Sequence, residues 1–176
     1  MSDHPSAVPV VSIVGAADAG KTTFLEKLIR ELTDRGVRVA TVKQHRHDCD
    51  TDVAGKDSWR HAQAGAAVAM VSSPSKLSMV QRVQREATLA ELAVLAFDAG
   101  SDILLTEGYK REGVNRVEIS RRAAESILLT SPEALLALVT DMPETAPAGV
   151  AVFGLDDAAG VADLVQSRFL ASRGGG

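Results

Sequence analysis

The segment Gly15-Ala16-Ala17-Asp18-Ala19-Gly20-Lys21-Thr22 decides the fold, because it matches the pattern G-x4-G-K-[ST] at every fixed position. An apolar run, Pro9–Val14, precedes it and is predicted to be a buried strand. Apolar residues then recur at helical spacing through Thr22–Arg35, and Gly36 ends that pattern. A strand, a glycine-rich turn and a helix in this order predict a P-loop, which binds the phosphates of a nucleotide.

The residue types in this loop suit phosphate chemistry. Glycines let the backbone wrap closely around phosphate oxygens, and successive N–H groups at the helix N-terminus face the anion. Lys21 would add positive charge near the β and γ phosphates, and the Thr22 hydroxyl would ligate Mg²⁺. We therefore expect every residue from Gly15 to Thr23 to belong to the nucleotide site. The sequence leaves open whether the acidic Asp18 points outward or faces a metal or a partner.

Strand and helix patterns alternate along the rest of the chain. The further predicted strands are Val37–Lys43, Ala67–Ser72, Ile103–Thr106, Arg116–Ser120, Leu135–Thr140 and Val150–Phe153. The further predicted helices are Ser58–Ala64, Thr88–Ala99 and Ala158–Ala171. This order predicts an α/β protein of the P-loop NTPase fold, with a mostly parallel sheet flanked by helices. The Ser73-Pro74 turn would let Lys76–Val80 pair with the preceding strand as an inserted β-hairpin. We expect one domain over residues 9–171, between a flexible arm (1–8) and a flexible tail (172–176).

Composition excludes several classes of function. The chain has 176 residues, 45% hydrophobic and 24% charged, and its net charge of −4 argues against broad nucleic-acid binding. We interpret Arg121-Arg122 as a solvated basic spot. The single cysteine, Cys49, excludes an internal disulfide. Met1–Pro9 lacks the pattern of a signal peptide, and no stretch approaches the ~18 apolar residues that span a membrane. We expect a cytoplasmic protein whose partners are neither nucleic acids nor membranes.

Charged residues follow several of the predicted strands. Ligands of parallel α/β sheets bind at the carboxyl ends of the strands, so Gly15, Lys43, Glu107 and Asp141 are expected along one edge. Glu107 would present its carboxylate to the magnesium shell, although a surface glutamate at a strand end is the alternative. Asp141 could accept hydrogen bonds from N1 and N2 of guanine, which would favour GTP over ATP. It could equally be a turn residue before Pro143.

The segment Lys43–Asp52 concentrates polar residues of two kinds. His45, His47 and Cys49 alternate with Asp48, Asp50 and Asp52, so in an extended chain each set would share one face. Three interpretations remain open: a switch-like loop beside the γ phosphate, a transition-metal site, or a solvated charged loop. On the first, Asp48 joins Thr22 and Glu107 at the magnesium, and the catalytic candidates are Lys21, Asp48 and Glu107.

Several blocks of sequence, in order, resemble the MobB family, adapter proteins of molybdopterin-guanine dinucleotide biosynthesis. The blocks are Gly20-Lys21-Thr22-Thr23, Val42-Lys43, His47-Asp48-x-Asp50-x-Asp52, Gly55-Lys56-Asp57-Ser58, Ala64-Gly65-Ala66, Leu104-Leu105-x-Glu107-Gly108-Tyr109-Lys110, Val139-Thr140-Asp141-x-Pro143 and Gly160-Val161-Ala162-Asp163. The resemblance covers roughly residues 9–170. It implies GTP and Mg²⁺ binding with slow hydrolysis, a homodimer, and assistance to the guanylyltransferase MobA. On this interpretation the chain is mainly an adapter, and at most a weak GTPase.

The chain departs from the family pattern at two places. Gln44 stands where the family usually has histidine, and Arg46 where it often does. A glycine often found in the family's P-loop is replaced by Ala17 or Ala19, and alanine at a position of positive φ would strain the loop.

Two other functions remain as alternatives. One is an ATP-dependent small-molecule ligase or kinase of the dethiobiotin synthetase type, which Glu107 would permit. The other is a metal-delivery GTPase that uses His45, His47 and Cys49.

Overall fold

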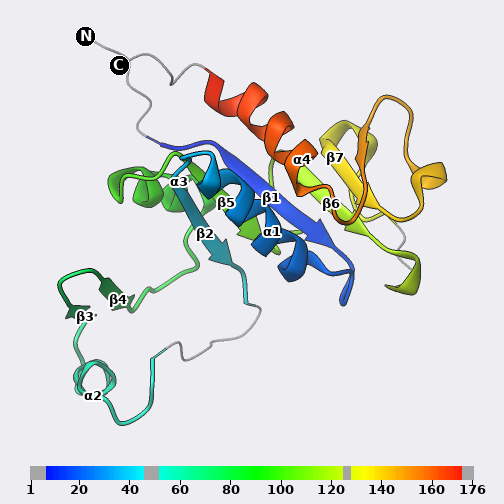
Figure 1. Ribbon diagram of the computed structural model, residues 1–176. Coiled ribbons are helices and arrows are strands. Elements are labelled where there is room, and N and C mark those ends of the chain that lie inside the picture. The colour runs from blue at the N-terminus through cyan, green and yellow to red at the C-terminus, as the bar shows by residue number, and fades with distance from the viewer. Residues whose placement is uncertain (1–6, 46–51, 125–127, 172–176) are drawn as a thin grey trace. The chain divides into compact units, whose positions relative to one another are not determined.

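The computed structural model describes residues 7–45, 52–124 and 128–171, and its core is a six-stranded parallel sheet (Figure 1). The strands are β1 (Val10–Gly15), β2 (Val39–Lys43), β5 (Ile103–Glu107), β6 (Arg116–Ser120), β7 (Leu135–Thr140) and β8 (Ala151–Phe153). Their order across the sheet is β2-β5-β1-β6-β7-β8, and every neighbouring pair is parallel. The predicted α/β fold with a mostly parallel sheet is confirmed.

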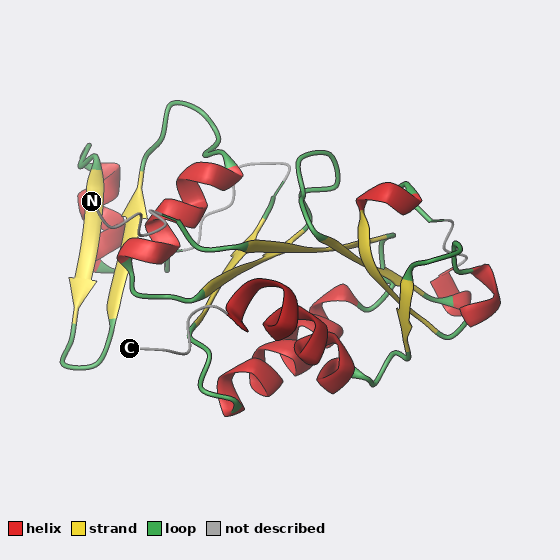
Figure 2. Ribbon diagram, turned by 90° about the horizontal axis from the view of Figure 1, so that it is seen from above, coloured by secondary structure: helices red, strands yellow, loops and turns green. Residues whose placement is uncertain are grey.

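Helices cover both faces of this sheet (Figure 2). They are α1 (Lys21–Asp34), α3 (Leu89–Asp98) and α4 (Ala158–Val165), the last continuing as a π-helical turn, Gln166–Leu170. Val11 and Ile13 of β1 lie in one core cluster with the buried faces of α1 and α4. Val10, which points to the opposite face because side chains alternate along a strand, packs with α3. β1 is thus buried on both faces, as its continuous apolar sequence predicts.

Short 3₁₀ turns follow or precede the strands at the β6–β8 side: Arg122–Ala124, Pro132–Ala134 and Pro143–Thr145. Val8, in the arm expected over residues 1–8, is 4% exposed, and its N–H donates to the carbonyl of Ala93. Within the described ranges, no helix is long and apolar enough to cross a membrane.

Residues 45–87 form a second compact unit, separate from the unit formed by residues 1–44 and 88–176. The second unit holds α2 (Asp57–Gln63) and an antiparallel hairpin of β3 (Val68–Ser72) and β4 (Leu77–Gln81). The predicted inserted hairpin is therefore confirmed. Many of its apolar side chains are exposed, namely those of Val68, Met70, Val71, Leu77 and Met79.

Candidate functional site

The P-loop lies between β1 and α1, and its first glycine is fixed by sterics. Gly15 has φ +144°, and a Cβ built there would lie 2.4 Å from the carbonyl oxygen of Ile119 on β6. At the other end Gly20 has φ +92° and caps α1 without any side-chain hydrogen bond. The first N–H groups of α1 thus face the loop without a side-chain cap, which is the arrangement that binds an anion.

The expected strain at Ala17 or Ala19 is wrong. The residue of the loop with positive φ, apart from its glycines, is Asp18 at 57°. Aspartate tolerates this left-handed conformation better than most residues do. The Asp18 side chain is exposed, so it points outward, and Ala19 is buried in the core cluster instead.

On the β5 side of the loop, three predicted residues meet at one oxygen atom. The Thr22 hydroxyl donates to Oε1 of Glu107 over 2.9 Å, and Nζ of Lys43 lies 3.1 Å from the same atom. Lys43 and Glu107 are directly paired in the β2–β5 register, which fixes their proximity. We call this cluster of Thr22, Lys43 and Glu107 the metal flank.

Two oxygen atoms of the metal flank have the spacing of neighbouring magnesium ligands. Mg²⁺ requires oxygen ligands at about 2.0–2.1 Å in octahedral geometry, so that neighbouring ligands lie about 2.9 Å apart. The Thr22 and Glu107 oxygens are 2.9 Å apart, and both are hard oxygen donors. Glu107 is only 8% exposed, so its charge faces few competing waters.

Lys21 lies beside the metal flank. Its Nζ donates to the carbonyl of Ala16 over 2.5 Å. The pKa of Lys21 is lowered, first by burial and then by the nearby charge of Lys110, while Glu107 opposes the shift. A bound polyanion would favour the charged form and reverse this shift.

The turn after β5 brings in Lys110, which the sequence analysis did not assign to the site. Gly108 and Tyr109 both have positive φ, 103° and 43°, and redirect the chain directly after Glu107. The Tyr109 N–H donates to Oε1 of Gln44 over 2.9 Å, and the Gln44 N–H donates to the carbonyl of Glu107. Gln44, where the resemblance led us to expect histidine, therefore joins the ends of β2 and β5. Its position three residues after Glu107 is the sequence feature from which Lys110 could have been assigned to the site.

On the β6–β8 side of the loop the predicted residue is Asp141, at the end of β7. Its Oδ1 accepts the N–H of Arg122 over 2.8 Å, so it does take part in a turn contact. Between the P-loop and the ends of β6 and β8 lies a cavity of about 130 Å³. It is lined by Ala19, Gly20, Thr23, Phe24, Lys27, Ile119, Arg121, Leu155 and Asp156. We call this side, with Arg121, Asp141 and the cavity, the nucleoside flank.

Some predicted site residues cannot be placed. His47, Asp48, Cys49 and Asp50 lie outside the described residues, so the switch-loop and transition-metal interpretations stay predictions. His45 is described and exposed. Among the residues that the structure describes, no three histidine, cysteine, aspartate or glutamate side chains are grouped to hold a metal ion.

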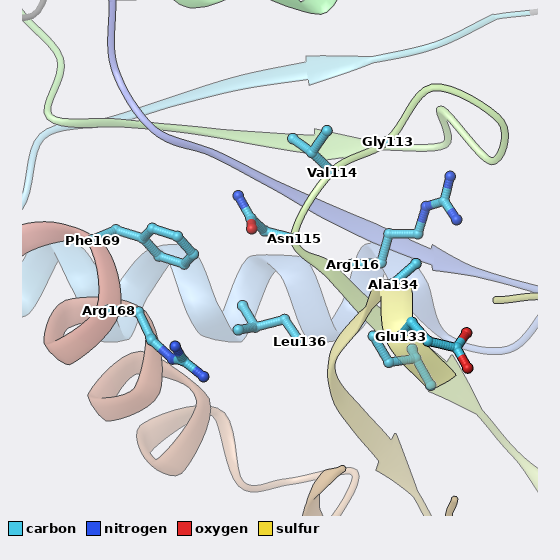
Figure 3. A pocket seen from close by; sticks show the side chains of 10 residues that line it. Gly113, Val114, Asn115, Arg116, Glu133, Ala134, Leu136, Arg168 and Phe169 are labelled. Atoms are coloured by element: carbon cyan, nitrogen blue, oxygen red, sulfur yellow. The ribbon is translucent and has the colours of Figure 1, made fainter. Parts of the chain in front are cut away.

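A larger cavity, of about 460 Å³, lies elsewhere (Figure 3). It is lined by Gly113–Arg116 at the start of β6, Glu133–Leu136 at the start of β7, and Arg168 and Phe169. Because the sheet is parallel, this is the edge opposite the P-loop. It contains none of the residues predicted for the nucleotide site.

The sheet order and the glycine-rich loop between β1 and α1 define an α/β protein of the P-loop NTPase-like class. The family model of the molybdopterin guanine dinucleotide synthesis protein B, MobB, matches residues 10–141. The chain therefore belongs to the MobB family.

Relatives of this family are similar over most of the chain. The molybdopterin-guanine dinucleotide biosynthesis adapter protein of Escherichia coli is 31% identical over 90% of this chain and 91% of its own length. That of Haemophilus influenzae is 32% identical over 77% of this chain and 76% of its own length. The crystal structure of Bacillus subtilis MobB superposes with a TM-score of 0.70 at 31% identity, covering 92% of this chain and 98% of that one.

Proposed function

We propose that this chain is a GTP- and Mg²⁺-binding adapter that assists a guanylyltransferase, MobA, in joining GMP to molybdopterin in the cytoplasm. Family membership supports the pathway, because the relatives are named adapter proteins of molybdopterin-guanine dinucleotide biosynthesis. The observation that carries the nucleotide part is the 2.9 Å contact between Thr22 and Glu107 beside the uncapped start of α1.

The strand order supports one orientation of the proposed nucleotide. Reading across the sheet, β5 and Glu107 lie on one side of the P-loop, and β6, β7 and Asp141 lie on the other. Thr22 and Glu107 would hold Mg²⁺, which would neutralise charge on the β and γ phosphates. The triphosphate would then bind at the metal flank and the P-loop, and the nucleoside would extend toward Asp141.

Slow hydrolysis agrees with the contacts that Glu107 makes. Its Oε1 already accepts from Thr22 and pairs with Lys43, which suits a metal ligand better than a general base. Lys21 would stabilise charge on the transferred phosphate. Of the three catalytic candidates, Asp48 then remains the one predicted to position the attacking water.

Guanine recognition is assigned to Asp141. Only Oδ1 of this carboxylate accepts the N–H of Arg122. A carboxylate has two oxygens and about four lone-pair sites, so it can still accept from N1 and N2 of guanine. Adenine lacks this pair of donors, and GTP should therefore bind better than ATP.

A homodimer is proposed through the hairpin of the second unit. A two-stranded hairpin is marginal by itself, and contiguous exposed apolar side chains mark interaction surfaces. Met70 is 62% exposed and Leu77 68%. Analytical ultracentrifugation should give a dimer for the natural chain and a monomer for Met70→Asp, with Lys76→Asp as the control on the same hairpin. A monomeric natural chain would contradict this part of the proposal.

The nucleotide proposal is tested by titration calorimetry with GTP and with ATP, each with Mg²⁺. A clear preference for GTP supports the adapter function, and stimulation of GMP transfer by purified MobA then tests the partner. A preference for ATP would favour the ligase or kinase of the dethiobiotin synthetase type instead. A transition metal retained in stoichiometric amount, and lost from Cys49→Ser, would favour the metal-delivery GTPase.

A further inference from the structure

Arg121 is the first residue after β6, and its guanidinium lies against the P-loop. Its Nη1 is 3.8 Å from the position that a Cβ of Gly20 would occupy. The same side chain lines the small cavity of the nucleoside flank together with Thr23. Composition alone suggested a solvated arginine, but the geometry places its charge beside the anion-binding end of α1.

The neighbouring Arg122 is engaged differently. Its backbone N–H donates to Asp141, and its guanidinium donates to Glu144 over 3.0 Å. The Arg122 side chain is therefore directed to Glu144, whereas that of Arg121 lies beside Gly20 of the P-loop.

The charges around the cavity support an anionic ligand. Lys27 and Arg121 both line the cavity, and its one acidic residue, Asp156, pairs with Lys27. The pKa of Asp156 is lowered mainly by Lys27 and further by Arg121. Two cations and one acid leave a positive balance at this side of the P-loop.

We propose that Arg121 binds the α phosphate of the bound nucleotide, an inference that rests on the proposed GTP function. Lys21 and Thr22 serve the β and γ phosphates and the metal, on the Glu107 side of the loop. The opposite side of the loop, where Arg121 lies, then receives the phosphate nearest the sugar. The planar guanidinium offers paired N–H donors that match phosphate oxygens.

An α-phosphate contact predicts a specific pattern of affinities. GTP and GDP share this phosphate, so loss of Arg121 should weaken both by the same factor. A contact with the γ phosphate would weaken GTP alone. The comparison of the two nucleotides therefore excludes a contact with the γ phosphate, while Lys21 and Thr22 are the residues assigned to the β phosphate.

The test is titration calorimetry of the natural chain, Arg121→Ala, Arg121→Lys and Arg122→Ala with Mg²⁺ and either GTP or GDP. We expect Arg121→Ala to weaken both nucleotides about 10- to 100-fold, the range for a charged hydrogen bond. The affinities of Arg121→Lys should lie between those of Arg121→Ala and the natural chain. Those of Arg122→Ala should stay within about threefold of the natural chain, because an exposed ion pair contributes little. Arg121 is exposed, so thermal unfolding midpoints should agree among the variants.

Four results would overturn the inference. Unchanged nucleotide affinities in Arg121→Ala would show that Arg121 does not contact the nucleotide. A loss of affinity for GTP alone would show that Arg121 contacts the γ phosphate instead. An equal loss in Arg122→Ala would reduce it to a nonspecific charge effect. A natural chain that binds neither nucleotide would overturn the proposed function itself, and this inference with it.

Discussion

On the metal flank, the groups that would serve a ligand already contact one another: the Thr22 hydroxyl, the Lys43 ammonium and the Glu107 carboxylate meet at one oxygen. On the nucleoside flank, Arg121 and Asp141 are exposed side chains on the turns that follow β6 and β7. Paired strand register fixes Lys43 and Glu107, and the start of α1 positions Thr22, whereas short turns position the residues of the nucleoside flank. On the proposed function, recognition of the metal and terminal phosphates would rest mainly on the sheet, and recognition of the nucleoside would depend on its connecting turns.

The largest expected effect comes from Gly15→Ala, which would disturb both flanks at once. The new Cβ would lie 2.4 Å from the Ile119 carbonyl oxygen, at a φ of +144°. Overpacking and backbone strain each cost about 1–3 kcal/mol, so a lower unfolding midpoint and weak binding of every nucleotide are expected. Gly36→Ala is the matched control, because Gly36 also has positive φ but no atom within 4 Å of its Cβ position. Equal effects of the two substitutions would show that sterics at Ile119 do not matter.

Lys21→Ala, a substitution beside the metal flank, should cause the next largest loss of nucleotide binding. Loss of a charged hydrogen bond to phosphate should cost roughly 2–3 kcal/mol of GTP binding. Calorimetry measures this directly, with the exposed Lys56→Ala as control. If Lys21→Ala binds GTP as tightly as the natural chain, the P-loop assignment fails.

Glu107→Gln separates metal binding from nucleotide binding. The amide keeps the shape of the side chain and an acceptor for Thr22, but it removes the negative charge that Mg²⁺ requires. Magnesium-dependent hydrolysis should fall about tenfold or more, with a smaller loss of nucleotide affinity. Both quantities should be measured in the same preparation. Equal losses would indicate a structural role for Glu107.

Asp141→Asn is expected to have the smallest effect, confined to the nucleoside flank. It should narrow the preference for GTP over ATP by about 1–2 kcal/mol, because an amide cannot accept two hydrogen bonds from guanine as a carboxylate does. The dissociation constants of both nucleotides give the ratio, and Glu144→Gln on the same turn is the control. An unaltered ratio would refute the base-pocket assignment.

The sequence predicted the fold and the closeness of the metal-flank residues to one another, because both follow from patterns of residues. Apolar runs and helical periodicity determine the parallel sheet, and parallel strands bring their carboxyl ends, hence Lys43 and Glu107, to one edge. The hairpin was predicted from its turn and two apolar runs.

The nucleoside flank and the loop conformation could not be predicted in the same way. Arg121 is one of two adjacent arginines, and no periodicity tells which of them faces Gly20. The positive φ fell on Asp18 rather than on an alanine, because a local loop path does not follow from residue types alone. Val8 shows the same limit, since its burial depends on α3, a distant segment of the chain.

The central claim is that Mg²⁺–GTP lies across the P-loop, with its metal toward Glu107 and its base toward Asp141. The direct test replaces Mg²⁺ with paramagnetic Mn²⁺ in the GTP complex and follows the broadening of assigned backbone amide signals by NMR. The account predicts strong, GTP-dependent broadening at Thr22 and Gly108, and weaker broadening at Asp141 and Asp156. Stronger broadening at Asp141 and Asp156, or broadening that does not require GTP, would contradict it.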